Sequence, residues 1–348
     1  MHPLKYLLSC IFIVFIGGEV KAQATIQVAQ TVKGVVYISD SKTVIANASV
    51  YYGGSMYGTT TDKDGQFELV AKSPKIPLIV SCVGYYSSTV YYQPGKPLSV
   101  YLKPKVEELM MVTIHADATK RKDGMKRKDE VALFISEFLG TSNRALSCTI
   151  TNLDDIDLFY DKKTEKLTAS CNVPIMIENK ALGYTISYYL DRFEKTPRQV
   201  AFAGNYIFKE GSLPIDDSTR SERERAYQGS RMQFIRSLWN HTLTKNGYKV
   251  ISATNGQLTE ENLISRDSLD DKYMILIKGL TMVNSSSPYV ITHLTANEGL
   301  IYISKDGYYG TGLRWSGGMG KQRIGDLLPY EYQPAIRPNE MIAMPAVK

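Results

Sequence analysis

The sequence predicts a mainly β protein in two parts: an antiparallel β-sandwich, then an α+β domain with a mostly antiparallel sheet and two helices. Short segments in which apolar and polar residues alternate fill residues 31–103. Two later stretches repeat apolar residues at helical spacing. The 24 tyrosines, against 2 tryptophans, suit half-exposed strands, because tyrosine favours strands and keeps its hydroxyl in water.

Residues 1–22 have the pattern of a secretory signal peptide. Lys5 provides the positive charge, residues 6–16 are almost wholly apolar, and Ala22 is a small residue at cleavage spacing. The apolar run is shorter than the roughly 20 residues that cross a bilayer. We therefore expect an exported mature chain with no membrane span, in the periplasm or on the outer cell surface.

One alternative for this leader is lipid attachment at Cys10. The residues before Cys10 imitate the motif that precedes a lipid-modified cysteine, but Cys10 stands before most of the apolar run rather than after it. We therefore favour ordinary cleavage. The net charge of +6 is a mild bias that helps contact with anionic surfaces and indicates little about the fold.

The first domain is assigned to residues 25–104. Residues 44–52, 67–69, 76–82 and 98–102 alternate along four of about seven expected strands, which places one face of each against a second sheet. The segments "GVVY", "ANASVYYGGSMYGTTTDKDGQFEL" and "LIVSCVGYYSSTV" resemble the carboxypeptidase regulatory-like domain, an immunoglobulin- or transthyretin-like sandwich. The resemblance implies a non-catalytic accessory module, of the kind found beside peptidases and at the start of outer-membrane receptors.

Asp62, Asp64 and Gly65 allow two interpretations. Alternate acidic residues followed by glycine open calcium loops, but the remaining ligands of such a loop are missing here. The favoured interpretation is a turn of the sandwich, in which Asp62 caps its own backbone and Gly65 takes a positive φ so that Phe67 re-enters the core.

A basic linker follows over residues 105–128, and it contains the run "TKRKDGMKRKD". Basic runs bind phosphates of nucleic acid or lipid. We expect no nucleic-acid partner, because the chain is exported and no aromatic residues interleave to stack on bases. A solvated linker is favoured over contact with an anionic surface.

The second domain is assigned to residues 129–348. Val131, Phe134 and Phe138 recur on one face of a helix that begins near Asp129 and ends at Gly140. A second helix is predicted over residues 221–246, with an aromatic stripe that is interpreted as a core face rather than a partner groove. The remaining segments predict strands. The clearest of these are "LGYTISYYLDRF", "KYMILIKGLTMV", "YVITHLTA" and "GLIYISKDGYYG".

This domain also carries a resemblance, which adds architecture but no mechanism. The segments "FISEFLGTSNRALSCTITNLDDIDLFY", "AFAGNYIF", "AYQGSRMQFIRSL" and "RIGDLLPYEYQP" are similar to the part that follows the regulatory-like domain in uncharacterised exported proteins of Gram-negative bacteria.

Three cysteines remain after the signal peptide: Cys82, Cys148 and Cys171. An odd number in an oxidising compartment allows one internal disulfide and one free thiol. Cys148 and Cys171 lie in neighbouring predicted strands of one domain, so we predict a disulfide between them. Cys82 is expected to be a buried small apolar residue.

No motif predicts catalysis, a cofactor or a metal. A zinc peptidase needs close His and Glu ligands, which none of the histidines has. The glycine-rich "GYYGTGLRWSGGMGK" ends in Lys321 but lacks the spacing of a phosphate loop, so a hairpin or loop that brings Trp315 to the surface is favoured. We therefore expect a non-catalytic binding or scaffolding protein with a protein or glycan partner in the cell envelope. The alternative is an unrecognised hydrolase in the second domain.

Overall fold

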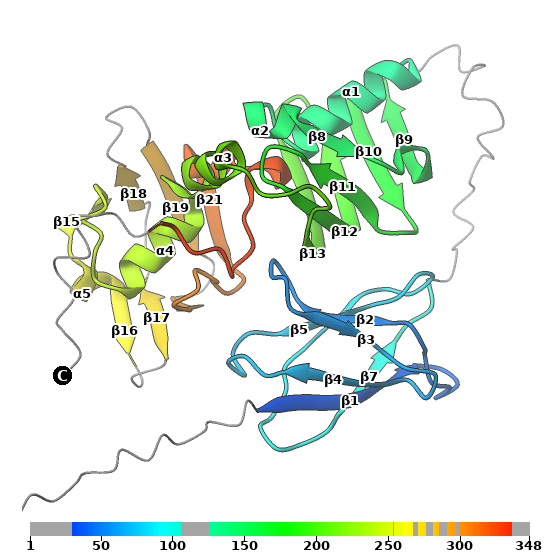
Figure 1. The fold of residues 1–348 in the computed structure, drawn as a ribbon. Helices are drawn as coiled ribbons and strands as arrows, with labels where there is room; N and C mark the ends of the chain where they lie inside the picture. The colour runs from blue at the N-terminus through cyan, green and yellow to red at the C-terminus, as the bar shows by residue number, and fades with distance from the viewer. Residues whose placement is uncertain are drawn as a thin grey trace, which may run out of the picture.

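The computed structural model describes residues 30–105, 125–252, 254–266, 271–275, 281–284, 291–296 and 299–335. The predicted signal peptide, Cys10 and nearly all of the predicted linker lie outside these ranges. The buried apolar side chains of the described residues form three separate clusters. They define a sandwich lobe (residues 30–105), a middle lobe (residues 125–227 and 324–335) and a C-terminal lobe (residues 231–321), as Figure 1 shows.

The sandwich lobe has the seven strands that the alternation predicts. One sheet has the order β4-β1-β7 and the other β3-β2-β5-β6. Alternate side chains such as Phe67 and Leu69 enter a common core. The strands are β1 (Thr31–Ile38), β2 (Ser49–Tyr52), β3 (Gly58–Thr60), β4 (Gln66–Val70), β5 (Leu78–Ser81), β6 (Ser88–Val90) and β7 (Leu98–Leu102).

One strand pair departs from the purely antiparallel sandwich expected from the sequence. β1 and β7 are parallel, with Gly34 opposite Leu98. A parallel pair needs a long crossover, and β2 to β6 provide it because β1 and β7 are the first and last strands of the lobe. Gly34 allows this close pairing, since a Cβ there would lie 2.5 Å from the carbonyl oxygen of Leu98.

The middle lobe is an antiparallel sheet covered by the first predicted helix, α1 (Arg127–Phe138). Phe138 packs edge-on against Tyr188 and Phe202, with ring centroids 4.9 and 5.5 Å apart. One side of β12 pairs along its whole length with β13, and its other side pairs first with β11 and then with β10. The strands are β8 (Cys148–Ile150), β9 (Ile156–Asp161), β10 (Lys166–Cys171), β11 (Ile175–Asn179), β12 (Tyr184–Lys195) and β13 (Val200–Glu210), and a short helix α2 (Asn143–Leu146) precedes them.

The C-terminal lobe packs two small sheets against a helix. One sheet has the order β15-β14-β18-β19-β21, so β21 is an edge strand, and the other has the order β16-β17-β20. Phe234 and Leu238 of the helix are fully buried in this core. The elements are β14 (Lys249–Ser252), β15 (Gly256–Leu258), α5 (Glu260–Leu263), β16 (Ile264–Arg266), β17 (Lys272–Ile275), β18 (Thr281–Asn284), β19 (Ile291–Ala296), β20 (Leu300–Ile303) and β21 (Leu313–Gly317).

The second predicted helix, residues 221–246, is two helices in the structure. α3 (Asp217–Tyr227) ends before Gly229, which has φ of +72°, and α4 (Arg231–Trp239) begins after it. The Ser230 hydroxyl accepts from the backbone N–H of Gln233, so it caps the new helix. A left-handed glycine followed by a capping serine therefore stops one helix and starts the next. The aromatic stripe does form a core face, as predicted.

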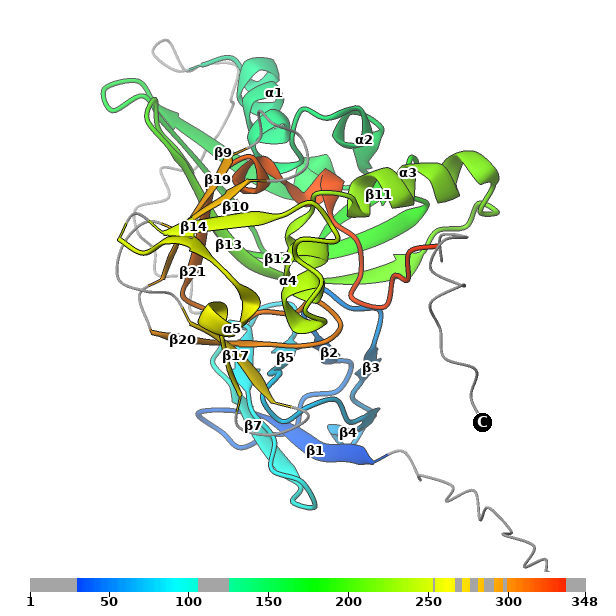
Figure 2. The same ribbon diagram turned by 90° about the vertical axis from the view of Figure 1, so that its left-hand side faces the viewer.

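The sandwich lobe is docked on the other two lobes, and in Figure 2 it lies below them. The turn between β2 and β3 adds main-chain hydrogen bonds to β13: Gly54 N–H donates to the Tyr206 carbonyl at 2.8 Å, and Phe208 N–H donates to the Ser55 carbonyl at 2.9 Å. The C-terminal segment crosses the same turn, where Tyr330 N–H donates to the Gly54 carbonyl at 3.0 Å. The turn therefore occupies this end of the β13 edge.

Candidate functional site

A wide groove separates the middle and C-terminal lobes, and it is the site that we describe in detail. Its volume is about 1080 Å³, at or above the upper end of an ordinary small-molecule pocket of roughly 300–1,000 Å³. One wall is the hairpin between β12 and β13, and the other is β21 with the short 3₁₀ helix Met319–Lys321. The lining residues are Glu137, Lys195, Pro197, Arg198, Gln199, Val200, Ala201, Phe202, Arg231, Thr295, Tyr309, Leu313, Arg314, Trp315, Ser316, Gly317, Gly320, Lys321 and Arg323.

The groove runs along strand edges rather than over the face of a sheet. Successive side chains of a strand point to opposite faces, so a pocket on one face would contact alternate residues. Here all five residues of β21 line the groove, and so do the first three residues of β13, Val200–Phe202. Among the strands of the described residues, β21 pairs only with β19, and this end of β13 pairs only with β12. Two unpaired strand edges therefore face the groove from opposite lobes.

Charge is the second feature of the groove. Six cationic side chains line it, against one carboxylate, Glu137. Glu137 pairs with Lys195 at 3.5 Å, so five positive charges are left without a carboxylate in the lining. The six cations are Lys195, Arg198, Arg231, Arg314, Lys321 and Arg323.

Two of these cations form the floor and are held by neutral oxygens. Arg323 is half-buried and donates from Nε to the Glu137 carbonyl at 3.1 Å and from Nη1 to the Gly320 carbonyl at 2.7 Å. Burial lowers the pKa of the Arg323 guanidinium below its usual value. Arg231 donates to the Gln322 carbonyl oxygen at 3.3 Å and to the Tyr309 hydroxyl at 3.5 Å. Both guanidinium groups are therefore fixed in place by neutral acceptors, and neither forms an ion pair with a carboxylate of the described residues.

Three other cations stand at the rim. Arg198, in the β12–β13 turn, and Arg314 and Lys321, on the opposite wall, are exposed. Within the described part of the chain, no hydrogen bond or ion pair holds any of their side chains. Their charges are free to meet a ligand in the groove.

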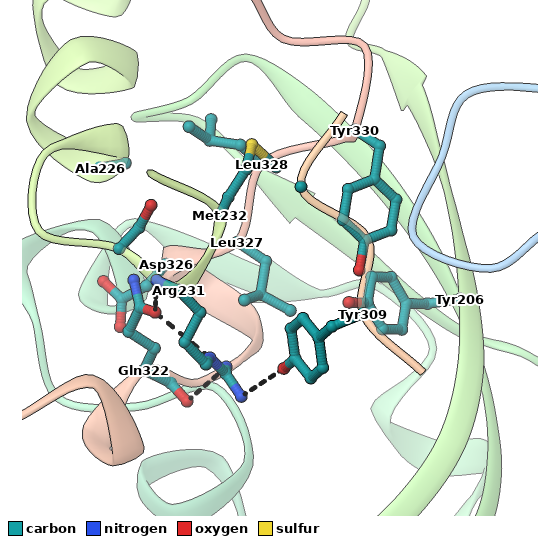
Figure 3. Close-up of a pocket in the computed structure, with 12 residues that line it drawn as sticks. Tyr206, Ala226, Arg231, Met232, Tyr309, Gln322, Asp326, Leu327, Leu328 and Tyr330 are labelled. Atoms are coloured by element: carbon teal, nitrogen blue, oxygen red, sulfur yellow. Dashed lines mark hydrogen bonds between the residues drawn. The ribbon is translucent and has the colours of Figure 1, made fainter. Parts of the chain in front are cut away.

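A small inner cavity opens behind Arg231. Its volume is about 70 Å³, and it shares Arg231 and Tyr309 with the groove. Figure 3 shows the rings of Tyr206, Tyr309 and Tyr330 on one side of it and Arg231 with Gln322 on the other. Burial raises the pKa of Tyr206 to about 12, so its hydroxyl stays protonated. The cavity has room for a few water molecules and not for a second ligand of ordinary size.

Aromatic side chains complete the lining. Trp315 packs against Tyr309 with ring centroids 5.5 Å apart and against Phe234 at 5.8 Å. Its indole Nε1 is buried and has no hydrogen-bond partner among the described residues. The sequence predicts that a hairpin or loop brings Trp315 to the surface. In the structure Trp315 lies on β21 and is half-buried at the groove.

The predicted turn of the sandwich lies far from this groove, and its geometry is that of a turn. The Asp62 carboxylate accepts from the backbone N–H groups of Asp64 at 2.9 Å and Gln66 at 2.8 Å. Gly65 has φ of +68° and donates to the Asp62 carbonyl. A Cβ at Gly65 would lie 2.9 Å from the carbonyl oxygen of Val36. Both Asp62 carboxylate contacts are thus to its own loop backbone.

The predicted disulfide between Cys148 and Cys171 is not formed in the structure, where Cys82 is a free thiol too. β10 and β11 lie one after the other along the same side of β12. Cys148 lies opposite Asn179 of β11, whereas Cys171 lies on β10, eight residues before Asn179. An extended chain rises about 3.3 Å per residue, so this separation exceeds the roughly 7 Å that a disulfide spans between Cα atoms. Burial raises the pKa of the Cys148 thiol to about 12, which keeps it protonated and unreactive.

Among the described residues, no group of three or more His, Cys, Asp or Glu side chains is arranged to hold a metal ion. The described histidines, His241 and His293, are outside the groove lining. None of the helices in the described ranges is long and apolar enough to cross a membrane. The chemistry that the groove offers is attraction of negative charge, with hydrogen-bond donors from guanidinium and ammonium groups.

The groove was not predicted from the sequence. Its two walls, residues 195–202 and 313–323, are more than 100 residues apart, and the cations on them do not form a run. The nearest signal is the segment "GYYGTGLRWSGGMGK", which predicts a surface position for Trp315 but no groove. Arg314 and Trp315 of that segment turn out to line the groove.

Comparisons with known proteins bear on the sandwich lobe. The model of the CarboxypepD_reg-like domain family matches residues 32–114. The chain therefore contains this domain, as its sequence motifs indicate. No curated protein matches the chain.

Among solved structures, the chain is similar to a protein from Bacteroides fragilis NCTC 9343 that is described as a suspected membrane-associated protein of unknown function. The identity is 11%, the TM-score is 0.17, and the match covers 83% of this chain and 94% of the other. So weak a likeness carries no argument about this chain.

Proposed function

We propose that this chain is a non-catalytic binding protein of the cell envelope and that its ligand occupies the groove between the middle and C-terminal lobes. The observation that supports the proposal most is the groove itself, where five cations that have no carboxylate partner in the lining lie beside two strand edges that pair with no further described strand. Binding sites occur preferentially where lobes meet. The signal-peptide pattern of residues 1–22 supports a location outside the cytoplasm.

The sandwich lobe has a supporting role in this proposal. Its β2–β3 turn and the C-terminal segment are bonded to β13, the strand whose other end lines the groove. The regulatory-like domain therefore stabilises the position of β13 in the middle lobe, in keeping with the accessory role of such domains.

Photo-crosslinking in native cells tests the binding function without assuming a ligand class. A photoreactive amino acid replaces Ser316, which lines the groove and is exposed, and, in a control, Lys63, which is exposed on the sandwich lobe. We expect a discrete crosslinked product from position 316 and none from position 63. No product from position 316 would refute the proposal.

A turnover assay addresses the alternative hydrolase. Panels of peptides, esters and glycosides are incubated with the intact chain, and product formation is measured. We expect no turnover above background. Reproducible turnover that a single Asp, Glu, His or Ser substitution in residues 129–348 abolishes would favour the hydrolase instead.

A further inference from the structure

We propose that the ligand of the groove is an acidic peptide segment, which binds in extended form by adding a strand between β13 and β21. This inference rests on the proposed binding function and names its ligand. It is carried by two features of the groove: its charge, and its two strand edges that pair with no further described strand.

The edges indicate a peptide. An exposed strand edge presents unpaired backbone N–H and C=O groups, and an extended chain satisfies them by main-chain hydrogen bonds. Tyr206 and Phe208 point their backbone groups at the Gly54–Ser55 turn. Backbone directions alternate along a strand, so Val200 and Phe202 present theirs on the same edge, toward the groove. A polysaccharide cannot complete this pattern, and a flat membrane surface does not fit between two walls.

The charge indicates an acidic peptide. Arg198 stands on one wall and Arg314 and Lys321 on the other, and the floor adds Arg231 and Arg323. A strand that lies between the walls therefore has cations beside it on each wall and at the floor, where they can pair with carboxylates. A basic or apolar strand would leave these charges unpaired, which opposes its binding.

Trp315 of β21 lines the groove. Trp315 is therefore a natural reporter, because the other tryptophan, Trp239, lies under the Lys272 ammonium at 4.8 Å and outside the lining.

The experiment uses the full mature chain with Trp239→Phe, so that fluorescence reports on Trp315 alone. The probe is a blocked peptide that repeats Glu-Glu-Thr-Thr, so that both faces of the extended strand carry carboxylates, and it is long enough to extend past both ends of β21. Its controls are the same peptide with Lys in place of Glu, and a fully N-methylated version that keeps the charge but cannot donate main-chain hydrogen bonds. We expect the acidic probe to shift the emission, and each control to bind at least about tenfold more weakly.

The variant set places binding in the groove. Arg198→Glu, Arg314→Glu and Lys321→Glu together should weaken the acidic probe at least about tenfold and reduce its salt dependence. The matched control is Lys63→Glu, Lys96→Glu and Lys180→Glu, which makes the same change in net charge at exposed residues outside the groove lining. This control should change affinity less than about twofold.

Several results would overturn the inference. Equal binding of the acidic and basic probes would remove the charge argument, and equal binding of the N-methylated probe would remove strand addition. Tighter binding of polygalacturonate, reversed by the groove variants, would assign the groove to an acidic glycan. A dimer that the groove variants dissociate would assign it to a second copy of the chain. If the probes fail while position 316 still crosslinks in cells, the binding function stands and only the ligand class is wrong.

Discussion

The two ends of β13 share one edge and differ in what meets it. At Tyr206–Phe208 the edge is bonded to the Gly54–Ser55 turn of the sandwich lobe. At Val200–Phe202 the same edge opens into the groove. The occupied end shows that this edge accepts main-chain hydrogen bonds from another segment, so the open end has the geometry to do the same.

The two ends of the β13 edge also differ in how their charged side chains are paired. At the occupied end, Lys72 meets Glu331 at 2.6 Å, and the Glu331 carboxylate also accepts from the Met56 N–H at 2.7 Å. At the open end, Arg198 has no carboxylate partner among the described residues. The filled end therefore pairs its lysine with a carboxylate. The open end pairs Lys195 with Glu137 at 3.5 Å but leaves Arg198 for a ligand.

Among these variants, Gly54→Val should have the largest effect, because it disturbs the contact between the β2–β3 turn and β13. Gly54 has φ of +76°, and a Cβ there would lie 2.8 Å from the Tyr330 ring. We expect a loss of about 2 to 4 kcal/mol in the free energy of unfolding, measured by urea titration. Gly95→Val is the matched control, because Gly95 has the same φ of +76° with nothing within 4 Å. Equal losses would mean that backbone strain alone, and not docking, explains the effect.

Glu331→Ala should weaken the same junction by a smaller amount. It leaves the half-buried Lys72 ammonium and the Met56 N–H without their acceptor, at a cost of about 1 to 3 kcal/mol in urea titration. Glu331→Gln keeps a neutral acceptor for Met56, so it should cost less. If both variants unfold like the parent chain, the carboxylate does not hold the lobes together.

Alkaline pH should also loosen the occupied end. Burial raises the pKa of Tyr206 and of Tyr52 to about 12, whereas tyrosine in the unfolded chain titrates near 10. Between these values the folded chain retains protons that the unfolded chain releases, so stability falls as pH rises from about 10 to about 12. Tyr206→Phe should lose less stability over this range, as followed by circular dichroism. An identical decline would exclude Tyr206 as a contributor.

The smallest effect is expected at the open end. Arg198→Glu, Arg314→Glu and Lys321→Glu change exposed side chains that hold no partner in the described part of the chain. The free energy of unfolding should change by less than about 0.5 kcal/mol. A large loss would show that these cations stabilise the fold, and it would weaken their assignment to a ligand.

Local patterns in the sequence predict much of this fold. Alternation at Phe67 and Leu69 places a strand, and the spacing of Phe134 and Phe138 places a helix, because both periodicities report on a single face of one element. The sequence also contains the signals for the break between α3 and α4, because Gly229 favours the end of a helix and Ser230 can cap the next one.

The same patterns do not predict which distant segments of the chain pair or pack together. The separation of Cys148 from Cys171 depends on which residues lie opposite each other in the sheet, and alternation does not encode that register. The groove depends on how two lobes pack, which brings Arg198 and Arg314 to opposite walls. No spacing of residues along the chain indicates that these two walls face each other.

Amide hydrogen exchange on the intact protein tests the central claim most directly, because Phe202 and Phe208 share one strand and one edge. In the free protein we expect the Phe208 amide, bonded to the Ser55 carbonyl at 2.9 Å, to exchange at least about tenfold more slowly than the Phe202 amide. The acidic probe should slow Phe202 and the amides of β21 and leave Phe208 unchanged. A Phe202 amide that is already protected, or one that the probe leaves unprotected, would contradict an open edge that binds an acidic strand.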